Sequence, residues 1–125
     1  SALMARILVI DDDPSIRHTM ERVLARDSHM VESYEDARVA LDALRQEQPD
    51  LVITDVYMPE MDGIEFLLSL WEAEPDLPVI VTSGGGSASS DHLLTDAAYL
   101  GVTVTLPKPF EIDQLLELVR SVLEG

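Results

Sequence analysis

Hydrophobic residues along this chain occur in two patterns, one typical of strands and one typical of helices, which follow each other in turn. In the first, three or four apolar, mostly branched residues stand next to one another, which is typical of strands buried on both faces of a sheet. Two further segments alternate apolar and polar residues and predict strands nearer the sheet edges. The five predicted strands cover residues 6–10, 29–34, 51–54, 78–82 and 102–106.

Between the strands, apolar residues recur three or four positions apart, which predicts helices with one buried face. The three clearest sets are Ile16, Met20, Val23 and Leu24; Ala37, Ala40, Leu41 and Leu44; and Ile64, Leu67, Leu68 and Trp71. Two more helices are predicted at about 90–100 and from Ile112 onward. Asp13-Pro14 is a helix-start signal, because aspartate caps a helix and proline fits its first position. Alternating strands and helices predict an α/β protein, with a doubly wound parallel sheet of five strands and five helices.

Length and charge narrow the possible functions. A chain of 125 residues accommodates one domain, which we expect to span 4–125, with Ser1–Leu3 an expression remnant. The net charge of −16 argues against direct binding to nucleic acid or to anionic membranes. The chain has no cysteine and no apolar run long enough to span a membrane, so we expect a cytoplasmic protein.

Polar residues gather where the predicted strands end. Asp11 and Asp12 follow the first strand, Asp55 the third and Ser83 the fourth, and Lys108 follows the fifth. Carboxyl ends of parallel strands share one edge of a sheet, where ligands bind. Crowded carboxylates favour a hard cation such as Mg²⁺. An aspartate can also attack phosphorus, while an ammonium and a hydroxyl group stabilise the transferred oxygens.

Some of these residues have simpler interpretations. Asp13 is expected to cap a helix and nothing more. The three histidines, His18, His29 and His92, lack metal-ligand spacing and are expected at the surface, and Trp71 is expected in the core. A single Asp11, Asp55 or Lys108 would most often be a solvated charge. Their joint position at strand ends is what favours a functional site.

Four motifs, ILVIDDDPSIR, DLVITDVYMPEMDGIEFL, PVIVTSG and LPKPF, make the chain resemble the receiver domain of bacterial two-component response regulators from about Ala5 to Leu123. The resemblance implies a flavodoxin-like sheet of strand order 2-1-3-4-5. It implies that Asp55 accepts a phosphoryl group from a phosphohistidine on a sensor histidine kinase or phosphotransfer protein. It also implies a signalling domain that assists only its own phosphorylation and dephosphorylation.

The same resemblance assigns the remaining site residues. Asp11, Asp12 and Asp55 would hold Mg²⁺, with Asp11 acting through water and the backbone carbonyl of Tyr57 completing the shell. Ser83 matches the switch hydroxyl group and Lys108 the phosphate-pairing lysine. Pro109 matches a proline that follows a cis peptide bond.

Two features depart from the family pattern and bear on the output. Thr105 stands where an aromatic switch residue is usual, and the Gly/Ser-rich run 83–90 lengthens the loop after the fourth strand. We therefore expect signalling to depend on Ser83 and on ordering of this loop and the fourth helix. The output surface is expected on the fourth helix, fifth strand and fifth helix, where it would bind an effector or a second copy of the chain.

Two alternatives remain open at this stage. A pseudo-receiver would share the fold and bind partners without being phosphorylated. A haloacid-dehalogenase-like phosphatase would use Asp11 as nucleophile and Asp13 as acid, but it would leave Asp55 without a role. The substitutions Asp55→Asn and Asp11→Asn separate the phosphatase from the receiver.

Overall fold

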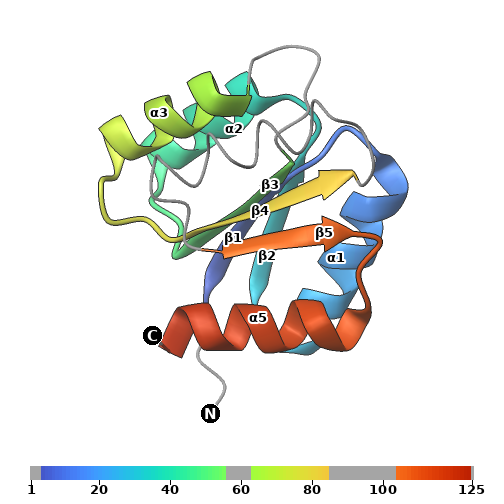
Figure 1. The fold of residues 1–125 in the computed structure, drawn as a ribbon. Coiled ribbons are helices and arrows are strands. Elements are labelled where there is room, and N and C mark those ends of the chain that lie inside the picture. The colour runs from blue at the N-terminus through green and yellow to red at the C-terminus, as the bar shows by residue number, and fades with distance from the viewer. Residues whose placement is uncertain (1–3, 56–62, 85–103, 125) are drawn as a thin grey trace.

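The computed structural model describes residues 4–55, 63–84 and 104–124, which form a central parallel sheet covered by helices (Figure 1). Its strands are β1 (Arg6–Ile10), β2 (Met30–Tyr34), β3 (Leu51–Asp55), β4 (Val79–Gly84) and β5 (Val104–Lys108). All neighbouring pairs are parallel, and the order is β2-β1-β3-β4-β5. The predicted strand order is confirmed, with the two alternating segments at the sheet edges.

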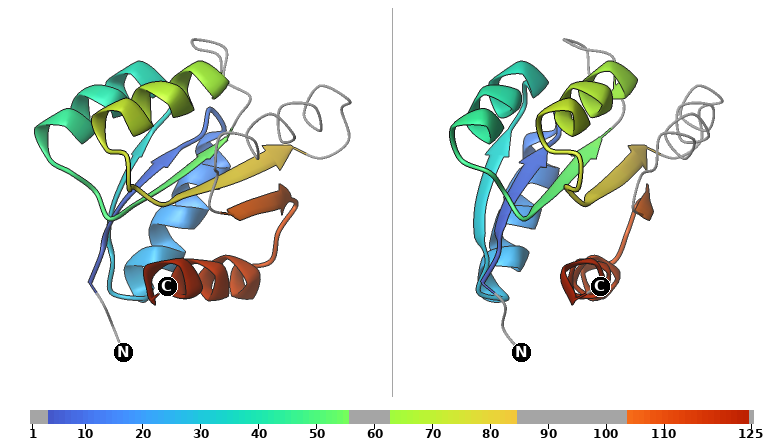
Figure 2. Two further views of the ribbon diagram at one scale, coloured as in Figure 1. Left: turned by 60° about the vertical axis from the view of Figure 1, so that its left-hand side comes forward. Right: turned by 90° about the vertical axis from the view of Figure 1, so that its left-hand side faces the viewer.

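The helices of the described part are α1 (Pro14–Arg26), α2 (Ala37–Gln46), α3 (Gly63–Ala73) and α5 (Ile112–Glu124). Helices α2 and α3 cover one face of the sheet, and α1 and α5 cover the other (Figure 2). Four of the five predicted helices are thus present. The remaining one, expected at about 90–100, lies outside the described residues.

Strand β1 shows why the sheet is buried on both faces. Leu8 and Ile10 belong to the hydrophobic cluster under α2 and α3, whereas Ile7 and Val9 belong to the cluster under α1 and α5. Successive side chains of a strand point to opposite faces, so a continuous apolar run fills both clusters. The sheet therefore holds its strand ends in fixed positions.

The predicted buried face of α3 is partly wrong. Phe66 and Leu70 are buried beside Leu67, but Leu68 is 52% exposed, and Trp71 is only partly buried. The sequence of this helix, GIEFLLSLWEA, is apolar almost all round. Its spacing therefore fits more than one face, and packing against the sheet selects the face that is buried.

Both ends of α1 show local features typical of helix termini. The Asp13 side chain accepts a hydrogen bond from the Ser15 N–H at 2.9 Å, as expected for a cap ahead of Pro14. Ser28, just after the helix, has a φ of 71°. This left-handed conformation ends many helices and is usually taken by glycine.

His29 corrects a second expectation, because it is buried rather than at the surface. Its Nδ1 accepts a hydrogen bond from the Ala5 N–H at 3.2 Å. The imidazole therefore holds the backbone directly before β1 in place. His18 is exposed as expected, and His92 lies outside the described residues.

Both ends of the described chain lie at the amino ends of the strands (Figure 1). Met4 lines a pocket of about 260 Å³ together with Asp50, Pro78, Val122 and Leu123. Within the described ranges, no helix combines the length and apolar character needed to cross a lipid bilayer.

Candidate functional site

Three carboxylates meet at the carboxyl ends of the neighbouring strands β1 and β3. Asp11 and Asp12 directly follow β1, and Asp55 is the last residue of β3. One carboxylate oxygen from each lies within 4.8 Å of the others, and we call these residues the acidic cluster. The sequence prediction that they converge is confirmed.

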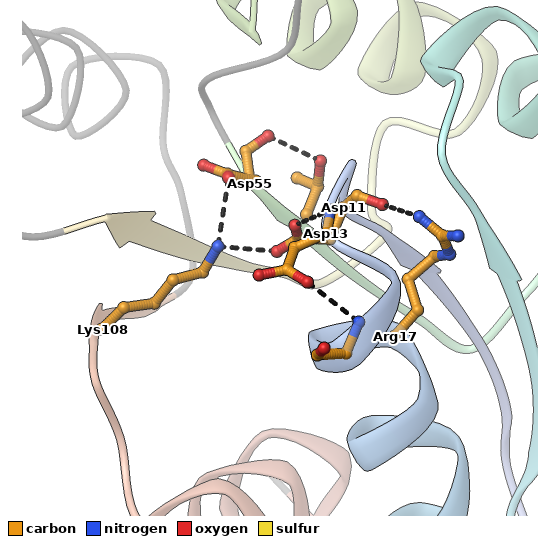
Figure 3. A network of polar contacts seen from close by, with 7 residues as sticks. Asp11, Asp13, Arg17, Asp55 and Lys108 are labelled. Atoms are coloured by element: carbon orange, nitrogen blue, oxygen red, sulfur yellow. Dashed lines mark hydrogen bonds and ion pairs between the residues drawn. The ribbon is translucent and has the colours of Figure 1, made fainter.

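Asp11 is the most firmly held member of the acidic cluster. It is 1% exposed, and each of its polar atoms has a partner. Its N–H donates to the Tyr34 carbonyl oxygen at 3.1 Å, and its carbonyl oxygen accepts from Arg17 Nη1 at 2.7 Å. Its Oδ1 accepts from the Asp13 N–H at 2.9 Å and its Oδ2 from Lys108 Nζ at 2.6 Å (Figure 3).

Lys108 crosses from the end of β5 to bind two carboxylates. Its Nζ lies 2.6 Å from Asp11 Oδ2 and 3.1 Å from Asp55 Oδ2 (Figure 3). Burial by itself would lower the pKa of Lys108. The hydrogen bond to Asp11 and the charges of Asp11 and Asp55 outweigh burial and raise this pKa. Lys108 therefore stays positively charged beside the two carboxylates. The peptide bond from Lys108 to Pro109 is cis, as the resemblance implied.

Asp12 is the exposed member of the acidic cluster. Loss of hydration raises its pKa above the ordinary value, and the negative charges of Asp11 and Asp55 raise it further. No lysine or arginine side chain within the described residues forms an ion pair with Asp12. Of the three carboxylates, Asp12 therefore has the most to gain from a bound cation.

The spacing of the acidic cluster fits a magnesium ion. Magnesium binds oxygen at about 2.0–2.1 Å, so oxygens that share one ion lie within about 4.2 Å of one another. The three carboxylate oxygens lie within 4.8 Å of one another, which is close to this spacing. Magnesium commonly takes one or two carboxylates and keeps several waters, so the cluster could hold the ion partly through water.

The other predicted site residues are placed only in part. Asp55 is 6% exposed, and its carbonyl oxygen accepts a hydrogen bond from Thr54 Oγ1 at 2.9 Å. Ser83 lies in β4 opposite Pro107, and its side chain is outside the described part of the structure. Tyr57 also lies outside the described residues. The contact of Arg17 with Asp11 was not predicted, because an arginine in a helix carries no sequence signal for it.

A parallel sheet of order 2-1-3-4-5, with carboxylates at the ends of strands one and three and a lysine at the end of strand five, is the arrangement that the resemblance to receiver domains implied. The chain belongs to the response regulator receiver domain family, whose model matches residues 7–120. It is thus a signalling domain of two-component systems.

Individual relatives agree with this assignment. The chain is 39% identical over 118 residues to response regulator MprA of Mycolicibacterium vanbaalenii, covering 94% of the chain and 50% of the relative. It is also 39% identical to the DNA-binding transcriptional regulator NtrC of Proteus hauseri, covering 94% of the chain and 24% of that protein. The chain therefore spans half the length or less of these two curated relatives.

Solved structures give the same result for the fold. The chemotaxis protein CheY4 of Vibrio cholerae superposes with a TM-score of 0.83 and 30% identity, covering 96% of this chain and 99% of that one. NtrX from Brucella abortus superposes with a TM-score of 0.90 and 31% identity, covering 98% of this chain and 27% of that one.

Proposed function

We propose that residues 4–125 act as a phosphorylatable receiver domain whose phosphoacceptor is Asp55. The observation that carries this proposal is that Asp55 Oδ2 lies 3.1 Å from Lys108 Nζ, in a cluster with Asp11 and Asp12. This arrangement surrounds one candidate nucleophile with a cation and with carboxylates that can hold a second cation. Such positioning and charge neutralisation are what phosphoryl transfer chiefly needs.

In the proposed reaction, a carboxylate oxygen of Asp55 attacks the phosphorus atom of a phosphohistidine. The new O–P bond forms as the N–P bond breaks, and the histidine leaves with the electron pair of that bond. In this proposal, the Lys108 ammonium and the Ser83 hydroxyl group then pair with phosphoryl oxygens. Lys108 needs little movement, because its Nζ already lies beside the Asp55 carboxylate.

We propose Asp11, Asp12, Asp55 and the Tyr57 carbonyl as the magnesium ligands. When bound, Mg²⁺ supplies positive charge that neutralises the phosphoryl group. Asp11 would orient the ion rather than react, because it is buried and both of its carboxylate oxygens accept hydrogen bonds. Asp13 caps α1, as expected for a residue with a structural role.

The proposed phosphoryl donor is a sensor histidine kinase or a phosphotransfer protein in the cytoplasm. The proposed output surface comprises the fourth helix, β5 and α5, and binds an effector domain or a second copy of the chain. The exposed side of α5 includes the acidic residues Asp113, Glu117 and Glu124. This charge supports a protein partner over direct contact with nucleic acid.

Intact-mass spectrometry after incubation with acetyl phosphate and Mg²⁺ tests the proposal. We expect the wild-type chain to gain one phosphoryl group, and we expect no gain without Mg²⁺ or in Asp55→Asn. Asp42→Asn removes an equal charge from an exposed position on α2 and serves as the matched control.

The other outcomes identify the alternatives. Phosphorylation that persists in Asp55→Asn and is lost in Asp11→Asn would support the phosphatase. No gain in any variant, combined with no Mg²⁺ binding, would support the pseudo-receiver.

A further inference from the structure

Arg17 links helix α1 to the turn after β1, which carries Asp11 and Asp12. Its Nη1 donates a hydrogen bond to the Asp11 carbonyl oxygen at 2.7 Å, and the contact is partly buried. Arg17 and Lys108 approach Asp11 from opposite sides (Figure 3). Lys108 holds the side chain of Asp11, whereas Arg17 holds its backbone.

This backbone contact reaches two members of the acidic cluster at once. The Asp11 carbonyl belongs to the peptide group that links Asp11 to Asp12. A peptide group is planar, so fixing its oxygen also fixes the orientation of the Asp12 N–H and limits the position of the Asp12 Cα. The hydrogen bond therefore restricts how the two carboxylates are presented relative to each other.

Arg17 affects the acidic cluster mainly through its hydrogen bond and less through its charge. Its side chain lines a pocket of about 500 Å³ that is also lined by Glu35 and Asp36. The water that this open pocket admits screens the guanidinium charge. Loss of the hydrogen bond should therefore outweigh relief of repulsion between Arg17 and a metal ion.

We propose that Arg17 is a positioning residue that sets the magnesium affinity of the acidic cluster. The inference rests on the proposed function, because it assumes that the cluster binds Mg²⁺. Groups that orient metal ligands from outside commonly change affinity by about 10- to 100-fold. Arg17 acts through one backbone hydrogen bond, so we expect an effect of about tenfold, at the lower end of that range.

Calorimetric titration with Mg²⁺ alone tests this role in the wild type, Arg17→Met and Arg17→Gln. Two variants are used so that one remains if the other does not fold, and circular dichroism in EDTA checks folding. Arg22→Met is the matched control, because it removes the same charge from an exposed position on α1. We expect Kd to rise about tenfold in both Arg17 variants and to change less than twofold in the control.

Phosphorylation kinetics separate positioning from general damage. In the Arg17 variants, the Mg²⁺ concentration that half-saturates the reaction with acetyl phosphate should rise in parallel with Kd. The rate at saturating Mg²⁺ should stay within about twofold of wild type, because the ion restores the geometry once bound. Equal Mg²⁺ affinity in wild type and folded Arg17 variants would overturn this inference and leave the proposed function intact. A wild-type chain that binds no Mg²⁺ would overturn both.

Discussion

Lys108 is bound more closely to Asp11 than to Asp55: its Nζ lies 2.6 Å from Asp11 Oδ2 and 3.1 Å from Asp55 Oδ2. In this state the lysine neutralises a proposed metal ligand as well as the proposed phosphoacceptor. A divalent cation at the acidic cluster would take over the first task. Lys108 would then be available to pair with a phosphoryl oxygen on Asp55.

This pairing predicts that Lys108→Met destabilises the metal-free protein. Asp11 is 1% exposed and would be left buried without its cation. Removing one partner of a buried pair costs about 3 kcal/mol or more in free energy of unfolding. Urea unfolding in EDTA measures this loss, and Arg38→Met, at an exposed ion pair with Asp36, is the control. Equal losses in the two variants would contradict the prediction.

Asp12→Asn should have the opposite effect and raise the thermal midpoint of the metal-free protein. The substitution removes a charge that Asp11 and Asp55 repel. We expect a rise of about 2–6 °C, a typical response of a domain of this size to one improved interaction. Asp13→Asn removes an equal charge but keeps a capping side chain, so its midpoint should barely change.

The stabilisation by Asp12→Asn should depend on pH. The pKa of Asp12 is raised in the folded protein, so acid favours the folded state at this residue. The Asp12 charge does not destabilise the folded protein below the pKa that Asp12 has in the unfolded chain, which is about 4. It destabilises the folded protein fully above the pKa that Asp12 has in the folded state. The difference in midpoint from wild type should therefore shrink from pH 7.5 toward pH 4. A constant difference would show that charge repulsion is not its cause.

Ser28→Gly should stabilise the protein by about 0.5–1 kcal/mol. Ser28 has a φ of 71°. A residue with a Cβ adopts this angle at a cost in free energy, whereas glycine adopts it freely. Ser121→Gly, at an exposed position on α5, is the contrasting variant, because glycine inside a helix is unfavourable and should lower stability. Urea unfolding compares the two variants, and a Ser28→Gly protein less stable than wild type would contradict the interpretation.

The ion pair between Asp27 and Arg120 should connect α5 to the end of α1 in a pH-dependent way. Asp27 accepts hydrogen bonds from Arg120 Nη2 at 2.8 Å and Nε at 3.1 Å. These contacts lower the pKa of Asp27, so its stabilising contribution is present above its ordinary pKa and is lost as pH falls through the lowered value. We expect Asp27→Asn to lower the thermal midpoint by about 1–3 °C near neutral pH, since exposed pairs contribute little. The loss should shrink as pH falls through the lowered pKa of Asp27.

A double-mutant cycle checks that the effect belongs to this pair. Asp27→Asn and Arg120→Met should together cost less than the sum of the two single changes. Strict additivity would place the effect elsewhere.

The sequence predicted the strands and the meeting of Asp11, Asp12 and Asp55 because both depend on local pattern. Apolar runs fix which segments form the sheet, and parallel strands bring their carboxyl ends to one edge. Asp13 was also predictable as a cap, because capping depends on neighbouring residues alone.

Features that depend on packing between distant segments could not be predicted in this way. The exposed Leu68 and the buried His29 were both misplaced, because local spacing does not say which side another element will cover. The sequence placed Lys108 at the correct edge but could not show that it binds Asp11. The contact between Arg17 and the Asp11 carbonyl was likewise hidden, since it depends on the angle at which α1 leaves the sheet.

The position of the two chain ends has a practical consequence. Met4 and Leu123 line the same pocket at the amino ends of the strands, whereas the acidic cluster lies at the carboxyl ends. A fluorophore, affinity tag or sensor surface attached at either end would lie on the side of the sheet away from the acidic cluster. Surface-based measurements of metal binding and phosphorylation should therefore give the same result whichever end carries the attachment.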